Sequence, residues 1–284
     1  MQHRLVLILS AILMMNLCGY AVSADKVKPK EFKIPDLPVV AHRGFSHEYP
    51  ENTVASAKGA ILAKAEGCEC DVYISRDGVV FIMHDGTFNR TTNVKAEIAD
   101  GKPKPVNIAD LSFAEIRELD AGSWKDAKFA GEKIPTLDEW LAALKDSKCW
   151  PVIEIKKAGF EQQVIDAVKK AEMEDQVVII AFPKDAVKAV RKLAPKIPVA
   201  WLWGDKWEKS DAELVEFLVA AANEVDTNLL DLAHTHLNTN VVKGLNDAGI
   251  TVWSWTIDDP ARMAELRRAG VVSITTNRPN IARP

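Results

Sequence analysis

The sequence contains little cysteine, with four residues in 284. One of them, Cys18, lies in the N-terminal segment described below. The other three, Cys68, Cys70 and Cys149, are an odd number, which does not suit a disulfide framework. Because Cys68 and Cys70 lie two apart in an apolar, strand-like stretch, they share one face of that strand. We interpret both as small core residues rather than as a metal or redox pair.

The sequence also lacks an excess of basic residues. The chain has 36 Lys and Arg against 40 Asp and Glu, a formal net charge of −4. No lysine- or arginine-rich stripe is present that would suit a nucleic-acid backbone. We therefore expect no nucleic-acid partner, while a local basic pocket could still bind a small anionic substrate.

Long hydrophobic runs are absent apart from one near the start. A basic n-region, an apolar run at 5–15 and small residues at 22–24 are typical of a signal peptide, and the run is too short for a permanent membrane span. We expect residues 1–24 to be removed and the protein to be exported, periplasmic or secreted, with no stable membrane span. The alternatives are a buried N-terminal helix and a lipoprotein attached through Cys18, although Leu17 before it argues against the latter.

Several motifs of common enzyme folds are missing too. No dinucleotide glycine fingerprint, phosphate-cradling Gly-Lys-Ser/Thr loop or Gly-x-Ser-x-Gly elbow is present. What the chain does contain is a series of short apolar runs, most rich in β-branched or aromatic residues, separated in its later part by helical patterns such as 136–146, 160–172 and 184–195. This alternation predicts a parallel sheet with helices outside it, and the number of units favours a (β/α)8 TIM barrel. The runs are 39–42, 68–74, 79–83, 151–155, 177–181, 198–203, 224–230, 250–255 and 271–275.

One connection breaks the alternation. Only Ser-Arg-Asp-Gly joins the runs 68–74 and 79–83, which is too short for a parallel crossover but suits a β-hairpin after the second strand. A turn centred on Asp77 and Gly78 would place Asp71 opposite His84. The remaining eight runs would then form the barrel.

Two segments lie outside the regular pattern. Residues 25–38 are charged and contain proline, which indicates a lead-in with no core of its own. Residues 86–135 are polar and glycine-bearing with one helical piece, and we interpret them as a small insertion over the barrel mouth. The predicted domain therefore spans 39–284.

Functional residues of such barrels lie at the carboxyl ends of the strands. Glu69 and Asp71 share one face of the second run, and Glu154 shares a face with Lys156 in a later one. Three acids converging on one mouth would repel one another unless a cation lay between them.

Oxygen ligands alone suit Mg²⁺ or Ca²⁺. Two alternatives remain open from the residues themselves. The acids could instead form a salt-bridge network with Arg43 and Lys156, or His42 and His84 could join them around zinc. As unliganded imidazoles, the two histidines suit general acid-base chemistry.

Taken in order, six motifs resemble the glycerophosphodiester phosphodiesterase family across essentially the whole chain after residue 24. A single fragment such as His-Arg-Gly would mean little, but the ordered set is highly specific. The motifs are AHRGFSHEYPENT (41–53), ECDVYISRDGVVFIMHDGTFNRTT (69–92), LDAGSWKDAKFAGEKIPTLDEWL (119–141), VIEIK (152–156), VWSWTIDD (252–259) and TTNRP (275–279).

The resemblance implies roles for individual residues, which strengthen the cation interpretation. It implies one divalent cation on three acids, two acid-base histidines, two phosphate-binding cations, a tryptophan beside the glycerol, and two supporting residues near the site. The acids that would bind the cation match Glu69, Asp71 and Glu154, and the acid-base histidines match His42 and His84. The phosphate-binding cations match Arg43 and Lys156, the tryptophan beside the glycerol matches Trp255, and the supporting residues match Glu51 and Asn52. The chain departs from the family's pattern at Asn277, where Asp is common, and at Ala181, where Ser is frequent.

The expected function is the metal-dependent hydrolysis of a glycerophosphodiester to glycerol 3-phosphate and an alcohol. Related phosphodiesterases that act on lysophospholipids or cell-wall glycerophosphate polymers are the nearest alternatives. A metal-dependent sugar isomerase and a non-catalytic barrel that only binds its ligand are more distant ones. The head-group preference, the choice between Mg²⁺ and Ca²⁺ and the oligomeric state have no signature in the sequence.

Overall fold

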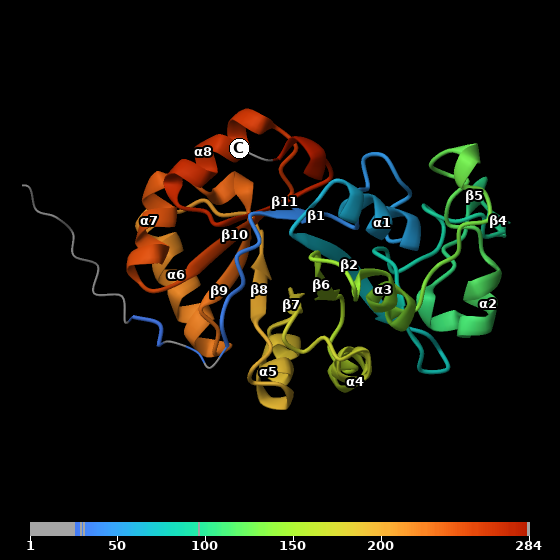
Figure 1. Cartoon of the computed structure of the whole chain (residues 1–284), viewed down its shortest axis with the longest axis horizontal. Helices are drawn as coiled ribbons and strands as arrows, with labels where there is room; N and C mark the ends of the chain where they lie inside the picture. The colour runs from blue at the N-terminus through green and yellow to red at the C-terminus, as the bar shows by residue number, and fades with distance from the viewer. Residues whose placement is uncertain (1–25, 29, 31, 96, 283–284) are drawn as a thin grey trace, which may run out of the picture.

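Eight parallel strands follow one another around a closed barrel in the computed structural model, which describes residues 26–282 except 29, 31 and 96 (Figure 1). The order is β1-β11-β10-β9-β8-β7-β6-β2, and β2 pairs back with β1 to close the ring. The predicted TIM barrel is confirmed, whereas the predicted signal peptide lies outside the described residues. The strands are β1 (Val39–Ala41), β2 (Gly67–Ile74), β6 (Trp150–Ile155), β7 (Val178–Ala181), β8 (Val199–Trp203), β9 (Leu229–Ala233), β10 (Thr251–Trp255) and β11 (Ser273–Thr276).

Helices cover the outside of the barrel between successive strands (Figure 1). Several begin with a side chain that caps the free backbone N–H groups of the first turn. The hydroxyl of Ser210, for example, accepts from the backbone N–H of Glu213 at the start of α6. The helices are α1 (Val54–Leu62), α3 (Leu137–Leu144), α4 (Glu161–Ala171), α5 (Lys184–Leu193), α6 (Asp211–Glu224), α7 (Thr239–Asp247) and α8 (Pro260–Ala269).

The strands divide their side chains between two layers, because successive residues point to opposite faces. The outward layer packs under the helices and includes Cys68, Cys70 and Val72 of β2. The inward layer fills the barrel and includes Val40, Val152 and other residues of alternate register. Both cysteines are buried free thiols, as is Cys149, so their interpretation as core residues is confirmed.

The β-hairpin is present, but its expected register is wrong. β3 (Val80–Ile82) runs antiparallel to β2 and pairs Val72 with Ile82, so Met83 and not His84 stands opposite Asp71. The N–H of Met83 donates to the carbonyl of Asp71 at 2.9 Å. The turn holds three residues rather than two because Gly78, with φ +89°, takes the left-handed conformation that adds a bulge.

One predicted strand is misplaced. The run 224–230 overlaps β9 only at its last two residues, since α6 extends to Glu224 and β9 begins at Leu229. Asp226, with φ +57°, turns the chain between the two elements. β9 therefore continues to Ala233, three residues beyond the predicted end.

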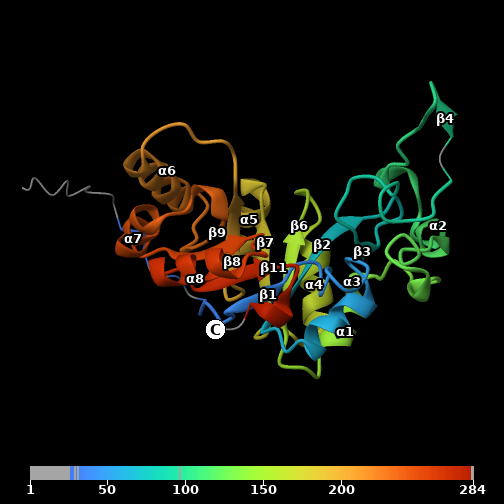
Figure 2. The same ribbon diagram turned by 90° about the horizontal axis from the view of Figure 1, so that it is seen from above.

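The segment 86–135 lies at one side of the barrel, beyond β2 and β3 (Figures 1 and 2). Its buried residues, including Phe88 and Ile116, form a hydrophobic cluster with Tyr73 and Phe81 of the hairpin. It is thus anchored to the strand that carries Glu69 and Asp71. Its elements are β4 (Ile98–Ala99), β5 (Lys102–Pro103), α2 (Phe113–Glu118) and the short 3-10 helices Ile108–Asp110 and Ala127–Phe129. The other 3-10 helices of the chain are His234–His236 and Pro279–Ile281.

The lead-in before β1 packs onto the barrel. Leu37 belongs to the inward layer, and the N–H of Val27 donates to the carbonyl of Ala248 at 2.9 Å. The side chains of Val27 and Leu37 are therefore buried in the core of the barrel rather than in a core of the lead-in's own. Within the described part of the chain, no helix has both the length and the apolar character that crossing a bilayer requires.

Candidate active site

A cavity of about 290 Å³ opens at the carboxyl ends of the barrel strands. Every barrel strand, or the loop directly after it, contributes to its wall. Seven of the predicted site residues line this cavity, and the other three, Asp71, Glu51 and Asn52, each contact the lining residue Arg43. The lining residues are His42, Arg43, Glu69, His84, Glu154, Lys156, Ile180, Phe182, Leu202, Asp231, Trp255, Thr256 and Thr275.

Three acids meet on one side of the cavity. Asp71 of β2 and Glu154 of β6 are direct partners in neighbouring strands, and Glu69 precedes Asp71 on the same face. All three are buried, and oxygens of the three carboxylates lie within 4.8 Å of one another. Such a group is unfavourable unless positive charge compensates it.

Two cations provide part of this compensation. The Nζ atom of Lys156 lies 2.7 Å from a Glu154 oxygen and 3.2 Å from an Asp71 oxygen, and Arg43 Nε lies 3.4 Å from Asp71. Asn52 donates a further hydrogen bond of 2.8 Å to Asp71. The salt-bridge network that the sequence left open therefore exists around Asp71.

The ionisation of the three acids differs accordingly. Burial acts to raise the pKa of Asp71, but Lys156 and Arg43 outweigh it and the pKa is lowered. Burial, reinforced by Asp71, raises the pKa of Glu154 to about 7 despite its contact with Lys156. Burial, together with Asp71 and Glu154, raises the pKa of Glu69 well above its usual range. The salt-bridge network therefore does not fully compensate the negative charge of Glu69 and Glu154.

Glu69 shows most directly that the group fits a cation. Its Oε2 accepts the backbone N–H of Arg43 at 2.6 Å, whereas its buried Oε1 has no hydrogen-bond partner. Buried carboxylate oxygens without partners are rare, and a divalent cation would satisfy this one. Among the described residues no histidine or cysteine belongs to the group, which favours Mg²⁺ or Ca²⁺ over zinc.

The turn after β1 holds the guanidinium of Arg43 in place. Arg43 has a φ of +55° and is followed by Gly44 at +75°, where a Cβ would lie 2.4 Å from the hydroxyl of Ser56. A non-glycine residue in this conformation is strained, and such strain often marks a functional position. The turn directs the Arg43 side chain to Glu51, with Nη1 2.9 Å from the carboxylate.

His42 is held by a chain of polar groups from the end of the sheet. Its Nδ1 lies 2.7 Å from Oδ1 of Asn277, and the amide Nδ2 of Asn277 donates to Asp258 at 2.7 Å. Because the amide nitrogen faces Asp258, the oxygen faces the histidine and accepts the proton on Nδ1. Burial, aided by the charge of Arg43, lowers the pKa of His42 to about 4. The neutral ring therefore presents an unprotonated Nε2.

His84 has an acidic partner instead. Its Nδ1 lies 2.7 Å from Asp85, which also accepts from Nε of Arg90 at 2.6 Å. Arg90 in turn donates to Glu51 at 2.7 and 2.9 Å, so the insertion reaches the mouth of the barrel through this side chain. Burial lowers the pKa of His84, while the nearby charge of Asp71 acts in the opposite direction. The hairpin register was wrong, but His84 still lines the cavity.

The far wall of the cavity is mostly apolar. Trp255 stands edge-on to Phe182 with ring centroids 5.5 Å apart, and its Nε1 donates to the backbone carbonyl of Asp231 at 3.1 Å. Ile180 and Leu202 complete this wall. The cavity therefore has a charged side around the acids and a side suited to carbon chains.

Sequence reasoning missed two residues of this site. Arg90 was part of a recognised motif but received no role, since only the folded insertion brings it to Glu51 and Asp85. Asp231 lay outside the predicted strand, because that strand was expected to end at residue 230.

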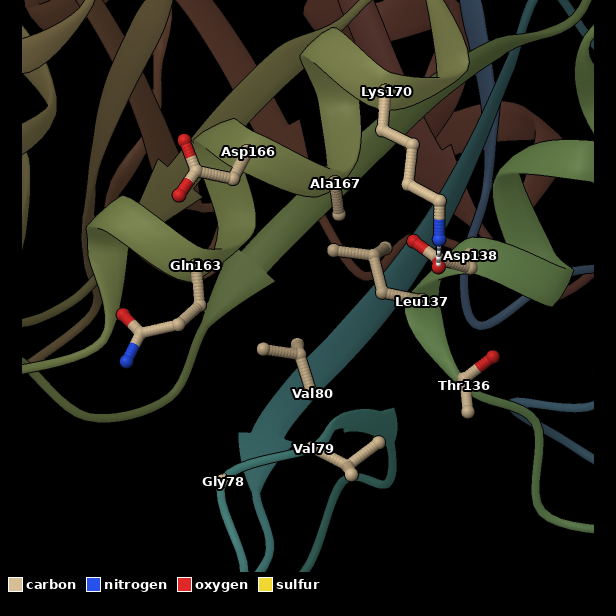
Figure 3. Close-up of a pocket in the computed structure, with 10 residues that line it drawn as sticks. All are labelled: Gly78, Val79, Val80, Thr136, Leu137, Asp138, Gln163, Asp166, Ala167 and Lys170. Atoms are coloured by element: carbon tan, nitrogen blue, oxygen red, sulfur yellow. Dashed lines mark hydrogen bonds and ion pairs between the residues drawn. The ribbon is translucent and has the colours of Figure 1, made fainter.

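A second hollow of about the same volume lies outside the barrel, between the hairpin turn, α3 and α4 (Figure 3). Its charged residues are turned to one another or to solvent, and Lys170 pairs with Asp138. None of the buried polar atoms that lack a hydrogen-bond partner in the described chain belongs to its lining. The barrel mouth is therefore the better candidate for chemistry.

Comparisons with known proteins agree with this geometry. The model of the glycerophosphoryl diester phosphodiesterase family matches residues 42–281. A glycerophosphodiester phosphodiesterase of Caldanaerobacter subterraneus is 33% identical over 246 residues, covering 85% of this chain and 94% of that protein. Among solved structures, a glycerophosphodiester phosphodiesterase of Agrobacterium tumefaciens is 26% identical with a TM-score of 0.68, covering 87% of this chain and 98% of that one.

A second solved structure carries a ligand. It is a phosphodiesterase of Oleispira antarctica in complex with the product sn-glycerol-3-phosphate. It is 26% identical to this chain with a TM-score of 0.72, and the match covers 86% of this chain and 94% of that one.

Proposed function

This chain belongs to the glycerophosphoryl diester phosphodiesterase family and is an enzyme of the phosphoric diester hydrolase class; from that premise, we propose that it uses one divalent cation, Mg²⁺ or Ca²⁺, to split glycerophosphodiesters into glycerol 3-phosphate and an alcohol. The product named in the Oleispira antarctica structure supports this choice of substrate.

One observation carries the proposal. Three buried acids converge beside two histidines, an arginine and a lysine, and the Oε1 atom of Glu69 has no partner. Glu69, Asp71 and Glu154 would hold the cation, which when bound supplies positive charge close to the phosphoryl oxygens. Arg43 and Lys156 add fixed positive charge from the protein and orient the phosphate.

In the first step the free 2-hydroxyl of the glycerol attacks the adjacent phosphorus. A new P–O bond forms, the bond to the alcohol breaks, and a cyclic phosphate results. One histidine removes the hydroxyl proton and the other protonates the departing oxygen. Water then opens the ring, and the two histidines exchange roles to give glycerol 3-phosphate.

The partners of the histidines support one assignment for the first step. His42 is neutral and donates its Nδ1 proton to Asn277, so its Nε2 can accept a proton and acts as the base. His84 donates to the carboxylate of Asp85, which stabilises the protonated ring and suits the acid. Arg90 keeps Asp85 ionised, since its hydrogen bonds lower the pKa of that acid to about 2.

The test is a substrate panel on the purified chain from residue 25 onward. Glycerophosphocholine should yield glycerol 3-phosphate and choline, EDTA should abolish the reaction, and added Mg²⁺ or Ca²⁺ should restore it. Full activity in EDTA would contradict cation dependence. Faster turnover of a lysophospholipid or a glycerophosphate polymer would instead favour the related phosphodiesterases.

A further inference from the structure

Asp231 is a buried acid at the cavity for which the proposed mechanism has no role. It lies on β9 with 1% of its surface exposed and lines the cavity, and its Oδ1 has no hydrogen-bond partner. Its neighbours Leu230 and Leu232 point to the outward layer, so its own side chain points into the barrel. A buried polar atom without a partner is costly, and a ligand could supply the missing bond.

Asp231 stands apart from the cation site. In the order of strands around the barrel, β9 lies four positions from β2, which is the opposite side of the ring. Among the described residues, the acids close enough to share an ion are Glu69, Asp71 and Glu154, without Asp231. The phosphate is therefore expected near β1, β2 and β6, and Asp231 faces the other end of the bound molecule.

The surroundings of Asp231 suit a neutral hydroxyl rather than a charged group. The side chains that share its wall of the cavity include Leu202, Trp255 and Phe182, which offer it no positive charge. Burial, with a further contribution from Glu154, raises the pKa of Asp231 well above its usual range. A protonated carboxyl both donates and accepts a hydrogen bond, as an alcohol does.

We propose that Asp231 is a specificity-determining residue that hydrogen-bonds to the free terminal hydroxyl of the substrate's glycerol. The proposal rests on the proposed function and deepens it. The 2-hydroxyl must stay beside the phosphorus and the histidines, so the terminal hydroxyl is the one that can reach across to β9. The substrate class is then phosphodiesters of glycerol with both hydroxyls free. A glycerol acylated at the terminal position lacks the proton and brings a bulky chain to this wall.

The experiment compares two ligands that differ by one oxygen. The affinities of sn-glycerol 3-phosphate and of its analogue with the terminal hydroxyl replaced by hydrogen are measured by calorimetry in the presence of Mg²⁺. The wild-type protein should bind the glycerol compound about 10- to 100-fold more tightly, the range expected when a buried polar group loses its partner. Asp231→Leu should reduce this ratio to within about threefold, and Asp231→Asn should retain most of it.

Ser254→Ala is the matched control. The Ser254 hydroxyl donates to the carbonyl of Leu232 at 2.8 Å, so its loss weakens the contact between β9 and β10 from the outward face without touching the cavity. This variant should melt at a lower temperature and keep the wild-type ratio. If Asp231→Leu does not fold, Asp231→Ala replaces it, and the ratio in the wild type tests the proposal in either case.

Equal affinities in the wild type, or an unchanged ratio in the leucine or alanine variant, would overturn the role of Asp231. Turnover of glycerophosphocholine is measured in parallel. A protein that shows the ratio but hydrolyses no phosphodiester would contradict the proposed function and leave the hydroxyl contact supported. A protein that hydrolyses the diester but binds the two ligands equally would support the proposed function and contradict the role of Asp231.

Discussion

Glu154 should make the stability of the metal-free protein depend on pH. Its pKa is about 7 in the folded protein against 4.5 as a free group. Between these values the folded state keeps the proton and the unfolded state releases it, so stability is complete below pH 4.5 and is lost as pH rises through 7. This difference in pKa corresponds to a loss of roughly 3 kcal/mol by pH 8.

Thermal melting can measure this loss. The unfolded-state carboxyl is already mostly ionised at pH 5, so part of the loss occurs below that pH. At about 2–4 °C per kcal/mol for a domain of this size, the melting temperature of the metal-free protein should fall by roughly 5–10 °C between pH 5 and pH 8 because of this group. Other groups titrate in the same range, so the comparison is with Glu154→Gln, which cannot ionise. The variant should lack this part of the decrease.

A divalent cation should reverse the effect. At 100 times its dissociation constant, an ion that binds only the folded state adds about 2.7 kcal/mol. At pH 5 the cation must displace a proton from Glu154, whereas at pH 8 it meets an ionised carboxylate, so MgCl₂ should raise the melting temperature more at pH 8. Sodium chloride of equal ionic strength is the control. Identical pH profiles for wild type and Glu154→Gln, with equal cation shifts at both pH values, would refute the reasoning.

Further predictions concern the site and the N-terminus. His42→Ala and His84→Ala should each lower kcat by about 10²–10⁴-fold with little change in melting temperature, and normal turnover in a folded variant would remove that histidine from the mechanism. Arg43→Lys should lower kcat/KM by about 10-fold or more, because an ammonium cannot reproduce the planar two-pronged contact with phosphate; equal kinetics would argue against this contact. Arg90→Gln should lower kcat and shift its pH profile, since it frees the carboxylate beside His84, and an unchanged profile would exclude this positioning role. We also propose that residues 1–24 direct export, so N-terminal sequencing of protein from the native host should begin at residue 25 rather than at residue 1.

The barrel and most of its site could be predicted because both depend on local patterns. Buried strands show as short β-branched runs, and the two-residue period puts Glu69 and Asp71 on one face whatever the rest of the chain does. Where neighbouring strands end at the same edge, their polar residues meet. The structure brings all ten predicted site residues to one mouth for this reason.

The parts that could not be predicted lie where a short stretch of sequence fits more than one conformation. The hairpin register depends on whether Gly78 adds a bulge to the turn, because a bulge shifts every pair of facing residues by one. The start of the predicted strand depends on where α6 ends, because Glu224 and Val225 fit the end of a helix as well as the start of a strand. That error removed Asp231 from the inner face of the barrel and hid it as a site residue.

The hydrogen bond between His42 and Asn277 joins positions 235 apart in the sequence. One partner follows the first strand of the barrel and the other follows the last, so a growing chain holds the acids, both histidines and the lysine long before it can complete this contact. Until β11 is made, the ring is open between β1 and β10, and no amide orients the His42 ring. Closing so long a loop carries an entropic cost. A chain that lacks β11 would still contain the three acids, both histidines and Lys156, but not the amide that orients His42. We therefore expect such a chain to be inactive.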